Sequence, residues 1–137
     1  MFSKILVPVD LAHADQLEKA LTVAADMANH HGAGVVYVGI TEQTPGAVAH
    51  TPAEYASKLN DFAAGLASKH GIDAEALSLT SHDPTTEINK LLVKAVQDTG
   101  ADLVVMASHP PSVTDYLWAS HGGWVAEHAA VSVFVVR

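Results

Sequence analysis

Two short polar stretches near the end of the chain contain the residue types that could bind an anion. Residues 107–111 read Ala-Ser-His-Pro-Pro after an apolar run, and residues 120–123 read Ser-His-Gly-Gly. Turns of small residues at the end of a strand and at the start of a helix present backbone N–H groups to a phosphate. The hydroxyl groups of Ser108 and Ser120 could add hydrogen bonds, and Ser120 is also a suitable helix N-cap. This region is therefore a candidate phosphate-binding loop.

Several residues of this loop allow two explanations each. Glycine is a poor helix former, so Gly122 and Gly123 in a first helical turn indicate either close approach of a ligand or tight packing of the helix on a sheet. His109 and His121 could bind phosphate oxygens, or they could be surface or capping histidines. Residues 110–118 include no Lys or Arg. A bound phosphate would then need the helix dipole, backbone N–H groups, a histidine or Mg²⁺.

The elements that must position this loop alternate between strand and helix. Strands are expected at residues 4–9, 35–40, 76–80, 103–107 and 131–136. Helices are expected to begin near Leu17, Thr51, Asp83 and Ser120 and to end near Gly32, Gly71, Gly100 and Ala129. Five strands alternating with four helices predict an α/β fold, a single doubly wound parallel sheet in one domain over residues 1–137. In such sheets ligands bind beyond the carboxyl ends of the strands.

Composition excludes several classes of function. The 137 residues include no cysteine, so there is no disulfide, thiolate metal site or cysteine nucleophile. The formal net charge is −8 and the few lysines are scattered, which argues against nucleic acid or an anionic membrane surface as a partner. No apolar run is long enough to span a bilayer, and the first residues read as a strand and not as a signal peptide. We expect a cytoplasmic protein without membrane insertion. We also expect no dedicated metal site, because the adjacent His30 and His31 cannot face one point.

The sequence resembles the universal stress protein family over essentially its whole length. The residues that carry the resemblance are Lys-Ile-Leu-Val-Pro-Val-Asp at 4–10, Gly-Ala-Asp-Leu-Val-Val-Met at 100–106 and Val-Phe-Val-Val-Arg at 133–137. The resemblance implies the strand order 3-2-1-4-5 of an adenine nucleotide alpha hydrolase-like fold, with strands one and four side by side. It also implies a homodimer formed by the last strand, Val131–Val136.

The resemblance further implies an adenine nucleotide site, with Mg-ATP as the ligand. One branch of the family binds ATP through a Gly-x2-Gly-x9-Gly-Ser/Thr loop, whereas this chain has Ala107, Pro110 and Ala119 in place of the glycines and is one residue shorter. It is more similar to a nucleotide-binding subgroup whose loop reads Ala-Ser-His-x-Pro. The implied binding residues are Pro8, Val9, Asp10, Ile40, Ala107, Ser108, His109, Pro110, Ala119, Ser120, His121 and Gly122. Pro8 and Ile40 would flank the adenine, Ile40 through its backbone groups.

Asp10 allows two roles that can hold at once. Its carboxylate could accept hydrogen bonds from a ribose or from the adenine edge, or it could cap the first helix. Because no side chain is placed as an obvious general base, we expect no catalytic residue, and at most slow ATP hydrolysis or autophosphorylation. The expected role is that of a stress-response sensor or regulator. The alternative is a nucleotide-independent dimeric interaction module that has lost ATP binding, which Ala119, the shorter loop and its lack of a cation would favour.

Overall fold

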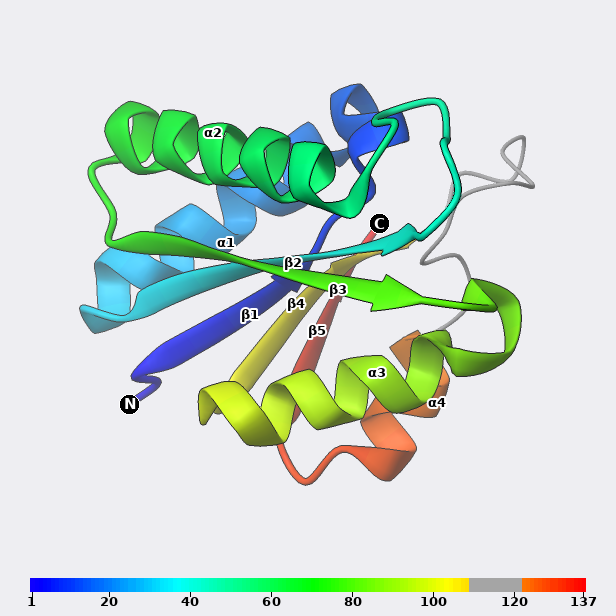
Figure 1. Cartoon of the computed structure of the whole chain (residues 1–137). Coiled ribbons are helices and arrows are strands. Elements are labelled where there is room, and N and C mark those ends of the chain that lie inside the picture. The colour runs from blue at the N-terminus through cyan, green and yellow to red at the C-terminus, as the bar shows by residue number, and fades with distance from the viewer. Residues whose placement is uncertain (109–121) are drawn as a thin grey trace.

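A single parallel sheet forms the centre of the protein (Figure 1). A computed structural model describes residues 1–108 and 122–137, apart from the side chains of residues 84–86. The strand order is β3-β2-β1-β4-β5, as expected from the sequence. The elements in chain order are β1 (Lys4–Pro8), the 3₁₀ helix η1 (Leu11–Leu17), α1 (Glu18–His31), β2 (Gly34–Glu42), α2 (Pro52–His70), β3 (Ala74–Ser81), α3 (Pro84–Thr99), β4 (Leu103–Ala107), α4 (Gly122–His128) and β5 (Ser132–Val136).

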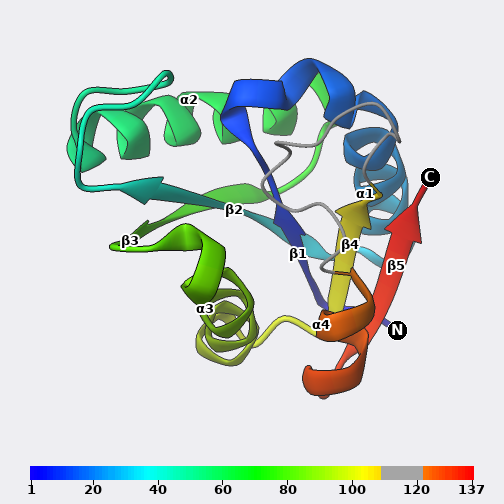
Figure 2. The ribbon, with the colours of Figure 1, turned by 90° about the vertical axis from the view of Figure 1, so that its right-hand side faces the viewer.

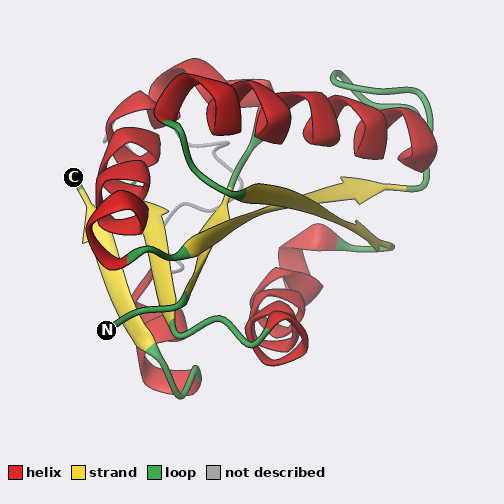
Figure 3. Ribbon diagram, turned by 90° about the vertical axis from the view of Figure 1, so that its left-hand side faces the viewer, coloured by secondary structure: helices red, strands yellow, loops and turns green. Residues whose placement is uncertain are grey.

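Helices cover both faces of this sheet. α1 and α2 lie on one face, and α3 and α4 lie on the other (Figures 1 and 2). Figure 3 shows the same three layers from the opposite side. This arrangement explains why the central strands are apolar on both faces: every side chain of β1 from Ile5 to Val7 is at most 1% exposed. None of the described helices is both long and apolar enough to cross a membrane.

The helix ends follow the capping residues in the sequence. Thr51 is the N-cap of α2 and its hydroxyl accepts a hydrogen bond from the Glu54 N–H at 3.1 Å. The helices α1, α2 and α3 each end at a glycine with a left-handed backbone: Gly32, Gly71 and Gly100. These positions tolerate the positive φ because glycine has no Cβ. The predicted helix boundaries of this part of the chain are therefore confirmed.

Some element bounds differ from the sequence-based expectation. β2 and β3 are both longer than predicted because they pair continuously from Val35↔Ala74 to Glu42↔Ser81. Backbone hydrogen bonds thus extend the ladder into polar residues that have no strand pattern. The chain also forms η1 before α1, and the described part of α4 begins at Gly122. The buried stripe of α2 consists of Tyr55, Leu59, Ala63 and Leu66, whereas Phe62 is only half-buried and packs edge-on against Tyr37 at 5.8 Å between ring centroids.

The amino ends of β1 and β4 are joined by one carboxylate. Asp102 accepts hydrogen bonds from the backbone N–H of Ser3 at 2.9 Å, from the Ser3 hydroxyl at 3.1 Å and from the Lys4 N–H at 3.1 Å. Burial by itself would raise the pKa of Asp102, but the hydrogen bonds from Ser3 and Lys4 lower the pKa below its ordinary value. The ionised form of Asp102 therefore stabilises the folded state.

Replacing Asp102 with Ala is expected to lower the free energy of unfolding by about 1–2 kcal/mol at pH 7, since a charged acceptor of several hydrogen bonds is lost. The folded-state pKa is depressed, so this contribution is complete above about pH 4 and disappears as the pH falls through the folded-state pKa. Urea unfolding of wild type and variant at several pH values measures the difference. Asp98→Ala is the control: Asp98 forms a surface ion pair with Lys94 at 2.9 Å, which contributes about 0.5 kcal/mol or less. Equal effects of the two variants would contradict the anchoring role.

Candidate functional site

The carboxyl end of β1 leads directly into a buried aspartate. Asp10 is 7% exposed and is the N-cap of η1, where its Oδ1 accepts a hydrogen bond from the Ala12 N–H at 3.1 Å. The second carboxylate oxygen, Oδ2, lies 2.9 Å from Nδ1 of His13. The capping role of Asp10 is therefore present, and it fixes the orientation of the carboxylate.

His13 takes part in this arrangement although the sequence did not single it out. Its backbone has φ −127° and ψ 32°, which interrupts the helical geometry of η1. Its N–H donates to the Asp10 carbonyl at 3.0 Å, so residues 10–13 form a turn around the Asp10 side chain. The three-residue spacing between Asp10 and His13 was the available signal, but it has this meaning only when a turn follows the strand.

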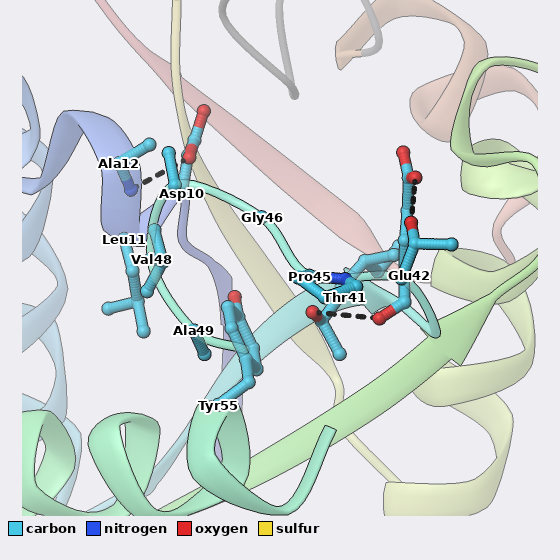
Figure 4. Close-up of a pocket in the computed structure, with 13 residues that line it drawn as sticks. Asp10, Leu11, Ala12, Thr41, Glu42, Pro45, Gly46, Val48, Ala49 and Tyr55 are labelled. Atoms are coloured by element: carbon cyan, nitrogen blue, oxygen red, sulfur yellow. Dashed lines mark hydrogen bonds between the residues drawn. The ribbon is translucent and has the colours of Figure 1, made fainter. Parts of the chain in front are cut away.

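A pocket of about 280 Å³ opens next to Asp10 (Figure 4). Its residues come from the segment after β1, from the carboxyl end of β2, from the β2–α2 loop and from the first turn of α2. They are Asp10, Leu11, Ala12, Ile40, Thr41, Glu42, Thr44, Pro45, Gly46, Ala47, Val48, Ala49 and Tyr55. Most of this lining is apolar, with a few polar groups among it, which is the usual character of a small-molecule site.

The end of β2 contributes backbone groups to this pocket. The β1–β2 ladder ends at the pair Pro8↔Val38, and the Val9 N–H donates to the Val38 carbonyl at 2.8 Å. Peptide groups two residues apart along a strand point to the same side. The N–H and C=O of Ile40 are therefore directed toward the β1 side of β2, beyond the last paired residue of β1.

The β2–α2 loop forms the outer wall of the pocket and is attached to α2. The Gly46 N–H donates to the Ala49 carbonyl at 2.9 Å, and the Lys58 ammonium group donates to the Val48 carbonyl. Glu54 accepts from the His50 N–H at 3.2 Å. This backbone hydrogen bond, together with Lys58, lowers the pKa of Glu54. These hydrogen bonds hold the β2–α2 loop together and against the first turns of α2.

The pocket has acidic character. Asp10 and Glu42 both line it, whereas none of its lining residues is Lys or Arg. Glu42 accepts a hydrogen bond from the Thr44 hydroxyl at 3.4 Å. Within the described ranges no group of three or more His, Asp or Glu residues could hold a metal ion. Chemically, this arrangement suits a neutral group that donates hydrogen bonds to the buried carboxylate of Asp10 or the exposed one of Glu42.

The structure brings together some of the predicted binding residues and separates others from the pocket. Asp10 and Ile40 line the pocket, while Pro8 and Val9 precede Asp10 in the chain, are buried and do not line the pocket. Ala107 and Ser108 lie at the end of β4, where Ala107 pairs with Val136 and the Ser108 N–H donates to the Val136 carbonyl at 2.7 Å. They do not line this pocket.

The remaining predicted residues concern the candidate phosphate loop. His109, Pro110, Ala119, Ser120 and His121 lie outside the described residues. Gly122 begins α4, and a Cβ added to it would lie 2.8 Å from Cγ2 of Val135 on β5. A Cβ added to Gly123 would meet no atom within 4 Å. Of the two explanations for this glycine pair, tight helix–sheet packing therefore accounts for Gly122.

The whole chain, residues 1–137, matches the model of the universal stress protein family. The chain belongs to this family. Universal stress protein G of Shigella flexneri is 26% identical over 152 residues, with 100% of both chains covered. This family member also resembles a solved universal stress protein in complex with cAMP, with a TM-score of 0.72 and 19% identity over 99% of this chain and 97% of that chain. The Archaeoglobus fulgidus universal stress protein in complex with dAMP gives a TM-score of 0.69 and 21% identity over 98% of each chain. At these identities the solved structures show that the fold is shared.

The glycine pair of α4 allows a direct test of the packing explanation in this universal stress protein. Gly122→Ala is expected to lower the free energy of unfolding by about 1 kcal/mol or more, since its Cβ would displace Val135. Gly123→Ala is expected to raise it by up to about 1 kcal/mol, because alanine is the better helix former in open space. Urea unfolding of both variants measures the difference. An unchanged or raised stability of Gly122→Ala would contradict the packing explanation.

Proposed function

We propose that this universal stress protein binds an adenine nucleotide at the carboxyl ends of β1 and β4, with the nucleoside in the pocket beside Asp10. The supporting observation is the pocket itself, since Asp10 and Ile40, two residues for which the family resemblance implies this role, both line it. The cAMP and dAMP complexes of relatives with the same fold agree with this proposal. The proposed physiological role is that of a stress-response sensor or regulator.

In the proposed complex the adenine lies against the end of β2. The Watson–Crick edge of adenine carries an acceptor at N1 beside a donor at N6. The backbone N–H and C=O of Ile40 form a complementary pair beyond the end of the β1–β2 ladder. Apolar contacts from Leu11, Val48 and Pro45 would cover the ring faces.

The charges of the pocket determine where the phosphates lie. Asp10 and Glu42 would repel a phosphate placed beside them. The phosphates therefore extend away from β2, toward the end of β4 and the start of α4. The proposed contacts there are Ser108, the loop residues His109, Ser120 and His121, and the backbone around Gly122. Mg²⁺ bound with ATP would supply the positive charge that the pocket lining lacks.

Isothermal titration with AMP, ADP and ATP, with and without Mg²⁺, tests this proposal. Asp10→Asn keeps an oxygen that can cap η1 but removes the negative charge, so nucleotide affinity is expected to fall about tenfold. Asp73→Asn is the matched control, because Asp73 is exposed at the opposite end of the strands. Absence of binding at millimolar nucleotide would refute nucleotide binding. Unchanged affinity in Asp10→Asn would instead refute the placement of the site.

A second function is favoured by the edge of the sheet. β5 pairs only with β4 among the described residues, and its Phe134 and Val135 are 43% and 44% exposed. Exposed apolar side chains on an unpaired edge strand are suited to pairing with another chain. We propose that residues 131–136 form the interface of a homodimer. A homodimer that binds no nucleotide would fit the alternative of a nucleotide-independent interaction module.

Phe134→Asp is expected to shift the protein from dimer to monomer, since it places a charge in the proposed apolar interface. Sedimentation velocity at several concentrations, with and without AMP, measures the assembly. Thr80→Asp is the control because it adds the same charge to β3 at the other edge of the sheet, where Thr80 is exposed. A wild-type monomer at all concentrations would exclude the dimer. Dimerisation that is identical with and without nucleotide, combined with no heat of nucleotide binding, would favour the interaction module.

A further inference from the structure

The Tyr55 ring occupies space that only a glycine leaves open. Tyr55 is in the first turn of α2, is 4% exposed and lies across Gly39 of β2. A Cβ added to Gly39 would lie 2.3 Å from the Tyr55 hydroxyl oxygen and 3.0 Å from Cε1 and Cζ of the ring. Gly39 therefore leaves room for the hydroxyl end of the Tyr55 side chain over the strand, at the edge of the pocket that Tyr55 lines.

The Tyr55 hydroxyl is directed into the space between Asp10 and the β2–α2 loop (Figure 4). No hydrogen bond joins it to another residue within 1–108 and 122–137, and it is not among the fully buried atoms that lack a partner, so it is open to the pocket that Tyr55 lines. A tyrosine hydroxyl in a largely buried position ordinarily finds a hydrogen-bond partner. Burial and, to a lesser degree, the negative charge of Asp10 raise the pKa of Tyr55 above its ordinary value. The hydroxyl thus keeps its proton and can act as a donor at neutral pH.

We propose that Tyr55 is a ligand-binding residue of this pocket and that, together with Asp10, it selects a ligand that carries a hydroxyl group at this point, such as a ribose. This inference rests on the proposed nucleotide site, which it makes more specific. Tyr55 would otherwise be one more member of the apolar stripe of α2, whose other members, such as Leu59, have no polar atom to satisfy.

The selectivity follows from the hydrogen-bonding capacities of the two side chains. An ionised carboxylate only accepts hydrogen bonds, whereas the protonated phenol of Tyr55 donates one. A group placed between them must therefore donate to Asp10 and accept from Tyr55. A hydroxyl group does both, an amino group conjugated to a base only donates, and a hydrogen atom does neither. The pocket should accordingly prefer a ribonucleotide over the deoxynucleotide that lacks the hydroxyl in question.

The carboxylate is held in place for this task. Ala12 and His13 contact different oxygens of Asp10, at 3.1 Å and 2.9 Å, so the carboxylate does not have to reorient when a ligand arrives. Gly39 leaves the space over β2 that the Tyr55 side chain occupies, and at this position Tyr55 is only 4% exposed. Preorganised polar groups lose little conformational entropy on binding, which increases the discrimination that they can provide.

Isothermal titration with AMP, 2′-deoxy-AMP and 3′-deoxy-AMP tests the inference on wild type and Tyr55→Phe. Wild type is expected to bind at least one of the deoxynucleotides about tenfold more weakly than AMP, the loss of about one well-placed hydrogen bond. Tyr55→Phe removes only the hydroxyl and keeps the ring over Gly39. In this variant the ratio between AMP and that deoxynucleotide is expected to shrink to about threefold or less.

Tyr37→Phe is the matched control. Tyr37 is fully buried and lies two residues from Gly39 on β2, and among the described residues its hydroxyl has no hydrogen-bond partner. It does not line the pocket, so removal of its hydroxyl should leave the preference for AMP unchanged. Thermal unfolding of both variants shows whether they remain folded.

The outcomes separate this inference from the proposed function. If wild type binds none of the three nucleotides, the nucleotide site itself is refuted. If wild type binds AMP and both deoxynucleotides equally, or if Tyr55→Phe keeps the full preference for AMP, nucleotide binding stands and the role of Tyr55 is overturned. Loss of the preference in both Tyr55→Phe and Tyr37→Phe would also overturn it, since the effect would then come from the core and not from the pocket.

Discussion

The rest of the structure depends on the way in which β1 is enclosed between β2 and β4. A buried strand must have its N–H and C=O groups paired on both sides, which β1 achieves through Leu6↔Val36 and Leu6↔Val104. β1 stops pairing with β2 at Pro8, whereas β2 continues to Glu42 because β3 supports it on the other side. The pocket occupies the space that this difference in strand length leaves open. It is therefore a consequence of the sheet's pairing and needs no separate scaffold.

The segment that leaves β1 combines structural and binding roles in the same side chain. Asp10 caps η1 and contacts His13, and it also lines the pocket. The two explanations that the sequence allowed for Asp10 are compatible because a carboxylate has lone pairs on two oxygens. The cap and His13 fix the orientation in which the carboxylate faces the pocket.

The sequence was informative where a local pattern has one physical meaning. Thr51 followed by Pro52 and Glu54 predicted the start of α2, and the apolar runs predicted all five strands and their order once the family resemblance was included. It was less informative for Tyr55, whose helical spacing is the same for a core residue and for a residue at the floor of a pocket. The difference depends on Gly39, which belongs to another element and becomes a neighbour of Tyr55 only in the folded chain.

The sequence by itself thus determined the alternation of elements, the helix caps and the position of Asp10 at a strand end, because these depend on burial pattern and on hydrogen bonds between near neighbours. The tertiary structure decided the length of β2, the enclosure of the pocket by the β2–α2 loop and the contact of Gly122 with Val135. Each of these depends on the distance between residues that are far apart in the chain. That distance is set by the order and lengths of the paired strands, which local patterns do not encode.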